Sequence, residues 1–173
     1  MSKKKTVFER ILDYIPGFHG YRRKEFLRED DRLVRDYLVR VLTEAIHALE
    51  DVEAFIVDRD YPTVERLDEI MRDLRKLMDE IRWAEHGYAP HYNISKVREE
   101  DLMKLVDFDA SLVEDVNGLK AFIEEMRDDA FKGNPVREKI YELYNRIKKL
   151  QDTWLKRAEI ICGYKPGGEG GRE

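Results

Sequence analysis

The sequence contains a single cysteine, Cys162, so the chain cannot form an intramolecular disulfide bond. Structural disulfides are rare in the reducing cytoplasm, and one cysteine fits that compartment. No apolar run approaches the roughly 20 residues that a membrane-spanning helix needs. Glu9, Arg10 and Asp13 also interrupt the segment where a secretory signal would be apolar. We therefore expect a water-soluble, cytoplasmic protein.

Uncharged polar residues are scarce as well. Serine, threonine, asparagine and glutamine together account for only 12 of the 173 residues, whereas 40% of the chain is charged. Proteins of hyperthermophiles show this bias, because networks of ion pairs become more favourable as the temperature rises. The composition therefore predicts a thermophilic origin. With 42% hydrophobic residues, a chain of this length can bury a sizeable core.

The net charge of −5 is distributed unevenly along the chain. Residues 1–24 carry a net charge of +5, so the rest of the chain carries −10. A protein dedicated to binding nucleic acid is expected to present a basic face. The acidic balance therefore argues against a nucleic-acid partner, and the basic N-terminal segment stands out as an exception.

Apolar residues recur at helical spacing in five segments, and no segment alternates with the period of two that a strand requires. The first segment, residues 5–15, is short and ends at Pro16-Gly17. Four longer segments cover about residues 21–58, 62–86, 95–131 and 135–162. Each carries a seam, a row of apolar residues in steps of three and four along one helix face, as in coiled coils. We predict an all-α, antiparallel up-and-down four-helix bundle with a short accessory N-terminal helix.

This pattern divides the chain into three parts. We expect residues 1–20 to form a short amphipathic helix and a Pro/Gly loop, and residues 21–163 to form the helical bundle domain. The glycine-rich residues 164–173 are predicted to form a flexible tail. Ser95 and Asn134 are the predicted N-caps of the third and fourth long helices, because their side chains can accept hydrogen bonds from a first helical turn.

An aspartate, Asp109, occupies a position in the third long seam. Either one helix runs through it with the carboxylate buried, or the helix kinks there and Asp109 caps a second segment. The steps of three and four continue unchanged on both sides, so we favour one helix. A buried carboxylate needs a cationic partner, and we expect Arg82 to supply it. Such a pair would set the register of the helices rather than act as an acid and a base.

Glu44 and His47 have the i, i+3 spacing of the Glu-x-x-His pairs that bind metal inside di-iron helical bundles. A complete site needs a second such pair, and no other histidine follows a glutamate at this spacing. We predict no cofactor, and keep a metal-binding, ferritin-like carboxylate bundle as the alternative. The sequence has no phosphate-binding loop, nucleophile elbow or Cys-x-x-Cys pair. The sequence therefore argues against an enzyme.

Two sets of residues are candidates for binding a partner, because aromatic and apolar side chains bury a large area at low entropic cost. One set surrounds the turn at Gly87, and the other is the apolar face of the N-terminal helix. Packing against the bundle is the competing interpretation for both sets, and burial of large apolar residues favours it. The candidate residues are Trp83, His86, Tyr88 and Tyr92 in the first set, and Val7, Phe8, Ile11 and Leu12 in the second.

The basic residues around the N-terminal helix suggest one role for its apolar face. Each lysine or arginine near an anionic membrane surface contributes about 1 kcal/mol to binding, and an apolar helix face adds to that. Residues 1–20 are therefore a candidate for reversible docking to a membrane surface or to a protein.

The run IPGFHGYRRKEFLREDDRLVRDYLVRVL, with RWAEHGYA and VDFDASLVEDV further along, resembles a family of uncharacterised archaeal and bacterial helical proteins. Members of that family open with Ile-Pro-Gly-aromatic-x-Gly-Tyr and a charged helix, and carry an Arg-aromatic-x-x-x-Gly-Tyr turn. The resemblance spans most of residues 14–116 and implies a helical fold without an established activity. Taken together, the sequence predicts a non-enzymatic interaction or scaffold protein whose partner is another protein or a second copy of the chain.

Overall fold

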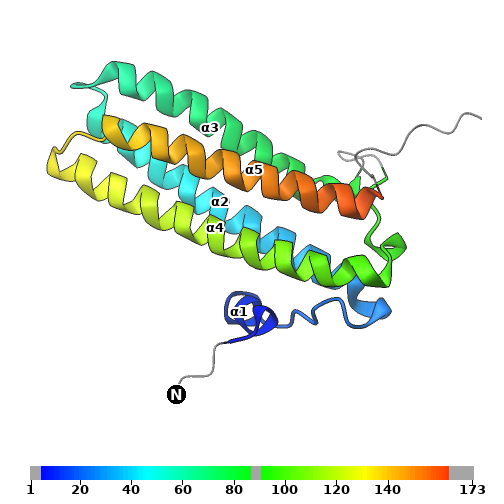
Figure 1. The fold of residues 1–173 in the computed structure, drawn as a ribbon. Coiled ribbons are helices and arrows are strands. Elements are labelled where there is room, and N and C mark those ends of the chain that lie inside the picture. The colour runs from blue at the N-terminus through cyan, green and yellow to red at the C-terminus, as the bar shows by residue number, and fades with distance from the viewer. Residues whose placement is uncertain (1–4, 87–90, 164–173) are drawn as a thin grey trace, which may run out of the picture.

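The computed structural model describes residues 5–86 and 91–163 and shows an all-α protein, as predicted (Figure 1). Within these ranges no strand occurs. Short 3₁₀ turns lie between some of the helices. The predicted flexible tail, residues 164–173, lies outside the described residues. The α-helices are α1 (Val7–Tyr14), α2 (Leu27–Ile56), α3 (Tyr61–Arg82), α4 (Glu99–Lys132) and α5 (Ile140–Cys162).

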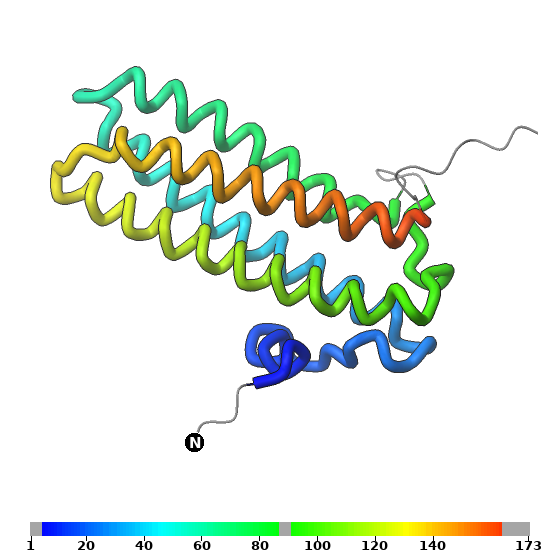
Figure 2. The backbone as a smooth tube through the Cα atoms, in the orientation of Figure 1, coloured from blue at the N-terminus to red at the C-terminus, as the bar shows by residue number. Residues whose placement is uncertain are grey.

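The four long helices lie side by side, and the chain changes direction between one long helix and the next (Figures 1 and 2). Helix α2 packs most extensively on α4 and α3, and α4 packs on α5. The contact between α3 and α5 is much smaller, so these two neighbouring helices pack against each other least closely. Among the described residues, no helix is long and apolar enough to cross a membrane.

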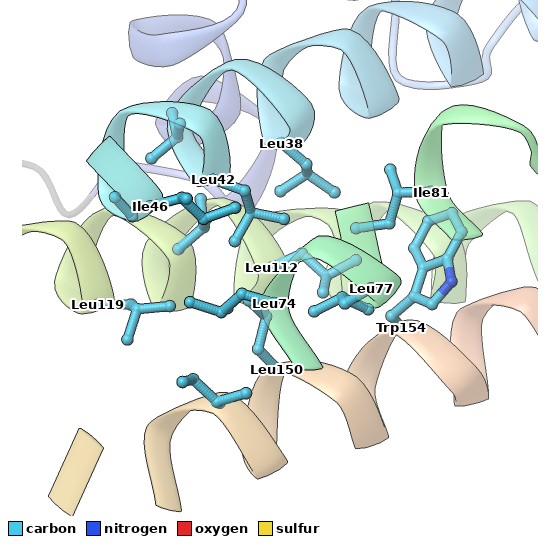
Figure 3. Close-up of a cluster of buried hydrophobic side chains, with 14 of the residues drawn as sticks. Leu38, Leu42, Ile46, Leu74, Leu77, Ile81, Leu112, Leu119, Leu150 and Trp154 are labelled. Atoms are coloured by element: carbon cyan, nitrogen blue, oxygen red, sulfur yellow. The ribbon is translucent and has the colours of Figure 1, made fainter. Parts of the chain in front are cut away.

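All four long helices contribute residues to the core, most of them from the seams (Figure 3). Full burial of a leucine or isoleucine side chain contributes about 1.5–3 kcal/mol, so these residues supply most of the driving force for folding. Phe55 is the exception in the α2 seam, because it lies at the helix end and is partly exposed. The labelled core residues in Figure 3 are Leu38, Leu42 and Ile46 from α2, Leu74, Leu77 and Ile81 from α3, Leu112 and Leu119 from α4, and Leu150 and Trp154 from α5.

Two predicted N-caps are wrong, because the helices begin later than expected. Ser95 lies in a 3₁₀ turn, where its own backbone N–H donates to the Asn93 side chain at 3.0 Å. Helix α4 then begins at Glu99. The Asn134 amide donates back to Asp129 at the end of α4, at 3.2 Å, and α5 begins only at Ile140.

Helix α1 and the loop after it pack on the long helices and contribute to the core. The side chains of Ile11, Ile15 and Phe18 are buried, and α1 lies against α4. Gly20 has a φ of +71°, and a Cβ at this position would lie 2.9 Å from the Phe8 ring. The loop therefore needs glycine here both for its backbone conformation and for the close approach of Phe8.

Candidate functional site

Charged side chains are buried together where the N-terminal part of α2 meets α4 and α5. Arg157 and Asp109 are both 0% exposed, and the Arg157 Nε lies 2.5 Å from the Asp109 Oδ1. The Arg157 Nη2 also donates to the Asp31 Oδ1 at 3.0 Å. We call this group the Arg157 cluster, and it consists of Arg157 from α5, Asp109 from α4, Asp31 and Arg35 from α2, and the loop residues Tyr21 and Tyr92.

Each tyrosine of the Arg157 cluster links a carboxylate to the guanidinium. The Tyr21 hydroxyl donates to Asp109 at 2.6 Å and accepts from the Arg157 Nη2 at 2.9 Å. The Tyr92 hydroxyl donates to Asp31 at 2.7 Å and accepts from the Arg157 Nη1 at 2.7 Å. All three guanidinium nitrogens are therefore engaged, which offsets the large cost of burying a charge.

Arg35 extends the cluster towards the end of α3. Its Nε donates to the Asp31 Oδ2 at 2.9 Å, and its Nη2 donates to the Glu85 carboxylate at 2.9 Å. Its Nη1 lies 3.4 Å from the backbone carbonyl oxygen of Arg82. Both oxygens of Asp31 are thus paired with arginines, and the turn after α3 is tied to α2.

Asp30 fixes the loop that carries Tyr21. Its buried carboxylate accepts from the backbone N–H groups of His19 and Tyr21, at 2.8 and 2.9 Å. Tyr21 has a φ of +58°, a conformation that costs a non-glycine residue free energy and persists only where the surroundings enforce it. The Asp30 bond to its N–H and the Asp109 bond to its hydroxyl supply that constraint.

The protonation states follow from burial. Burial raises the pKa of the Asp109 carboxyl, and the adjacent Arg157 charge opposes that rise. Burial also raises the pKa of the Tyr21 and Tyr92 phenols, so both keep the protons that they donate. For Arg157, burial lowers the pKa, but Asp109 and the other cluster groups outweigh it and raise the pKa well above its usual range. The charged and polar groups of the cluster are thus paired with one another, and these bonds suit the cluster to holding the helices in position.

The prediction for Asp109 is confirmed in part. It lies inside an uninterrupted α4 as a buried core residue, not as a cap. Its partner is Arg157 and not Arg82, because the Arg82 side chain points to the surface and pairs with Asp79 at 3.7 Å. A sequence signal for Arg157 existed. The steps of four and three in the α5 seam lead to Arg157 directly, through Leu143, Ile147, Leu150, Trp154, Arg157 and Ile161.

The predicted aromatic set around Gly87 is not a single surface. Trp83 and His86 are exposed and stack edge to face, with ring centroids 5.7 Å apart. Tyr92 is instead buried in the Arg157 cluster. Tyr88 lies outside the described residues.

The predicted N-terminal set lies against the long helices. Ile11 is buried, and Val7, Phe8 and Leu12 are half-buried against the core. One of the basic residues of this N-terminal segment, Arg10, forms an ion pair with Glu114 of α4.

Glu44 and His47, the alternative metal ligands, are not brought together with further ligands. The Glu44 carboxylate accepts from the Lys120 Nζ at 2.6 Å and from the Arg40 Nη1 at 3.3 Å. His47 is exposed. Among the residues that the structure describes, no group of three or more His, Cys, Asp or Glu side chains could hold a metal ion.

An open groove of about 1050 Å³ lies between the first halves of α3 and α5. Sequence reasoning missed it, because its walls belong to two helices that are far apart in the chain. Its tyrosines are exposed, with Tyr61 at 60%, Tyr141 at 76% and Tyr144 at 43%. Its charged lining consists of Arg66, Arg72, Arg137, Glu65, Asp68, Glu69 and Asp73.

Glu53 of α2 lies near Asp68, one of the residues that line this groove. Its Oε1 atom is buried and has no hydrogen-bond partner among the described residues. Burial and the negative charge of Asp68, a groove residue, raise the pKa of Glu53 to about 7.

The comparisons with known proteins do not assign this groove or the Arg157 cluster to a family. The resemblance suggested by the sequence motifs therefore stays a prediction. No family model, no curated protein and no solved structure matches the chain.

Proposed function

We propose that the protein is a non-enzymatic helical scaffold that binds a protein partner through the groove between α3 and α5. One observation carries this proposal, namely that three tyrosines and three arginines gather on the walls of one open groove. Tyrosine and arginine are among the residues that contribute most to affinity at protein interfaces. A tyrosine on a helix also offers a large contact area with few side-chain torsions to restrict.

The character of the groove favours a macromolecule over a small ligand. Small-molecule sites are mostly apolar and enclose most of the ligand surface. Here seven of the fourteen lining residues are charged, and the groove opens along the side of the molecule. A protein surface with its own polar side chains fits such a lining better.

We further infer that the scaffold is an antiparallel, up-and-down bundle with coiled-coil-like seams. Short connections between consecutive helices support this arrangement, because they join antiparallel neighbours. Residues 57–60 connect α2 to α3, and residues 133–139 connect α4 to α5. The single cysteine supports a cytoplasmic location for this activity.

Two competing functions receive less support. Docking to a membrane through residues 1–20 would require α1 to leave α4 and to expose Ile11, which is buried. Metal binding through Glu44 would require its carboxylate to give up the two cations that now engage it. The groove needs no such rearrangement.

Site-specific photo-crosslinking in cells of the native host tests the proposal. A photoreactive phenylalanine analogue replaces Tyr141 in the groove, and in a matched control it replaces Met103 on α4. The two positions are equally exposed, at 76% and 77%. We expect discrete light-dependent protein adducts at position 141 and not at position 103. No adduct at 141, or the same adducts at both positions, would contradict the proposal.

A further inference from the structure

We infer that the protein bound at the groove is a second copy of this chain, which forms a two-fold symmetric dimer through the exposed side of α3 and α5. This inference rests on the proposed function and names its partner. It is supported by the apolar residues, the charges and the size of that side of the molecule.

Exposed apolar side chains form a row on the side of α5 that borders the groove. Tyr141 and Tyr144 are one turn apart, and Leu155 follows Tyr144 by eleven residues, which is close to three full turns. Leu155 is 57% exposed, so the row extends beyond the groove along α5. Tyr61 at the start of α3 adds a fourth large side chain. Single exposed apolar residues are ordinary, but these lie in and beside a groove whose walls also carry charged side chains.

The two walls of the groove carry opposite net charge. The α3 wall has four carboxylates and two arginines, and so a net charge of −2. The opposite wall, which we call the α5 wall, includes Arg137 from the 3₁₀ turn directly before α5. Next to this wall, the Lys148 ammonium of α5 lies 5.3 Å from the centre of the Tyr144 ring. In a two-fold interface the same surface of both copies meets itself, so each α3 wall can face the α5 wall of the other copy.

This arrangement explains why a second copy fits better than an unrelated protein of one charge sign. A uniformly basic partner would meet the α5 wall unfavourably, and a uniformly acidic one would meet the α3 wall unfavourably. The same face of a second copy, rotated by 180°, places its positive α5 wall opposite the negative α3 wall, and its α3 wall opposite the α5 wall.

The size of the face agrees with a dimer. Helices α3 and α5 have 22 and 23 residues, so at about 1.5 Å per residue each is roughly 33 Å long. Two adjacent helices about 10 Å wide present a face of about 650 Å² before side-chain relief is added. Stable interfaces bury about 800 Å² on each partner. The α3–α5 face, covered along its whole length, reaches the lower part of the range of about 600–1,000 Å² per partner.

Light scattering coupled to size-exclusion chromatography tests this inference on the full chain. At about 100 μM, a concentration at which even weak dimers form, we expect twice the chain mass of 20.6 kDa. Tyr141→Glu should weaken the dimer at least about tenfold, as loss of a central interface residue does. Met103→Glu, at an equally exposed position on α4, should leave it unchanged. Circular dichroism verifies that each variant is folded.

A charge swap separates the proposed contact from a general loss of stability. Glu69→Lys with Asp73→Lys should weaken the dimer, as should Arg137→Glu with Lys148→Glu, and the four changes together should restore it. A monomeric wild-type chain at about 100 μM, a Tyr141→Glu dimer of unchanged strength, or a failed rescue would overturn the inference. If the chain is monomeric while position 141 crosslinks to another protein, only this inference fails. If position 141 gives no adducts, the proposed function fails too.

Discussion

At the scale of single residues, Arg157 holds several parts of the chain in place. Desolvation of a guanidinium costs several kcal/mol, and that cost is offset only where its nitrogens all have partners. Here the partners come from α2, α4 and two loops. The planar, forked guanidinium suits this position, because it donates to groups on several sides at fixed angles in a way that a lysine ammonium does not.

Replacement of Arg157 by methionine tests this role. The change leaves the buried carboxylate of Asp109 without its cation and removes one of the two arginines that pair with Asp31, although the volume of the side chain is nearly kept. We expect the free energy of unfolding to fall by about 3–5 kcal/mol, the range measured when one partner of a buried ion pair is removed. Urea denaturation followed by circular dichroism measures it.

A second variant distinguishes the cost of an unpaired buried carboxylate from the cost of the lost side-chain packing of Arg157. Arg157→Met combined with Asp109→Asn also removes the carboxylate that the single change leaves without a cation, and should recover part of the stability. If the single change costs less than about 1 kcal/mol, the cluster does not hold the helices as described.

The raised pKa of Glu53 predicts how the free energy of unfolding depends on pH. Its pKa is about 7 in the folded protein, against an ordinary value of 4.5. Between these pH values the unfolded chain has released a proton that the folded protein still holds, so stability falls as the pH rises. The favourable contribution of Glu53 is fully present below about pH 4.5 and is lost as the pH passes about 7.

The Glu53→Gln variant should lose this pH dependence. Its free energy of unfolding, relative to wild type, should increase between pH 5 and pH 8. Glu65→Gln, at an exposed groove carboxylate, serves as the control. Parallel pH profiles for wild type and Glu53→Gln would show that Glu53 titrates near its ordinary pKa.

At the scale of helices, the seams were predictable because they depend on spacing within one helix. Steps of three and four place residues such as Val34, Leu38 and Val41 on one face, and all three are buried. Asp109 was correctly placed inside a continuous helix for the same reason. Helix ends were less predictable, because Asn134 could cap the next helix or bond back to Asp129, and local sequence favours neither.

Contacts between helices were not predictable from spacing alone. The choice of Arg157 over Arg82 as partner of Asp109 depends on the axial shift and rotation of α4 against α5. The groove depends on how far apart the starts of α3 and α5 lie. In addition, the spacing places Arg157 on the buried face of α5, but it does not say which residue of another helix Arg157 contacts.

Helix α1 can be tested by deletion of residues 1–18. The deletion removes three buried side chains, Ile11, Ile15 and Phe18. At about 1.5–3 kcal/mol for each fully buried side chain, their loss is comparable with the 5–15 kcal/mol that stabilises a typical domain. We expect a large drop in melting temperature, measured by circular dichroism.

The same deletion decides whether residues 1–20 form a docking element. If the shortened chain melts like the full one and no longer binds anionic vesicles, α1 is a separable membrane-binding segment. If it melts far lower and the full chain stays in the supernatant with vesicles at low salt, α1 is part of the core. The packing of α1 on α4 favours the second outcome.

At the scale of the whole molecule, the two ends of the helical body differ. One end is closed by the Arg157 cluster, which joins the loops at Tyr21 and Tyr92 to three long helices. The groove lies towards the other end, where α3 and α5 begin. Figure 1 shows the starts of these two helices at the same end of the molecule. A closed end of this kind can hold the helices in register while the walls of the groove remain free to bind.

Ion pairs also connect the long helices along their surfaces. Lys120 of α4 contacts Glu44 of α2 at 2.6 Å, and Arg75 of α3 contacts Glu50 of α2 at 2.8 Å. Such solvent-accessible pairs contribute little at 25 °C, about 0–1 kcal/mol each. Their contribution grows with temperature, because the cost of desolvating charged groups falls.

A thermophilic origin therefore predicts a specific response to heat and salt. We expect a melting temperature above about 80 °C at neutral pH and low ionic strength. Addition of about 0.5 M NaCl should lower it by several degrees, because salt screens the surface pairs and leaves the buried Arg157 cluster unaffected. Scanning calorimetry at the two salt concentrations measures both effects. Unfolding near about 50 °C, as in mesophilic domains, would exclude the thermophilic origin. A high melting temperature that salt does not change would assign the stability to the core and to the Arg157 cluster.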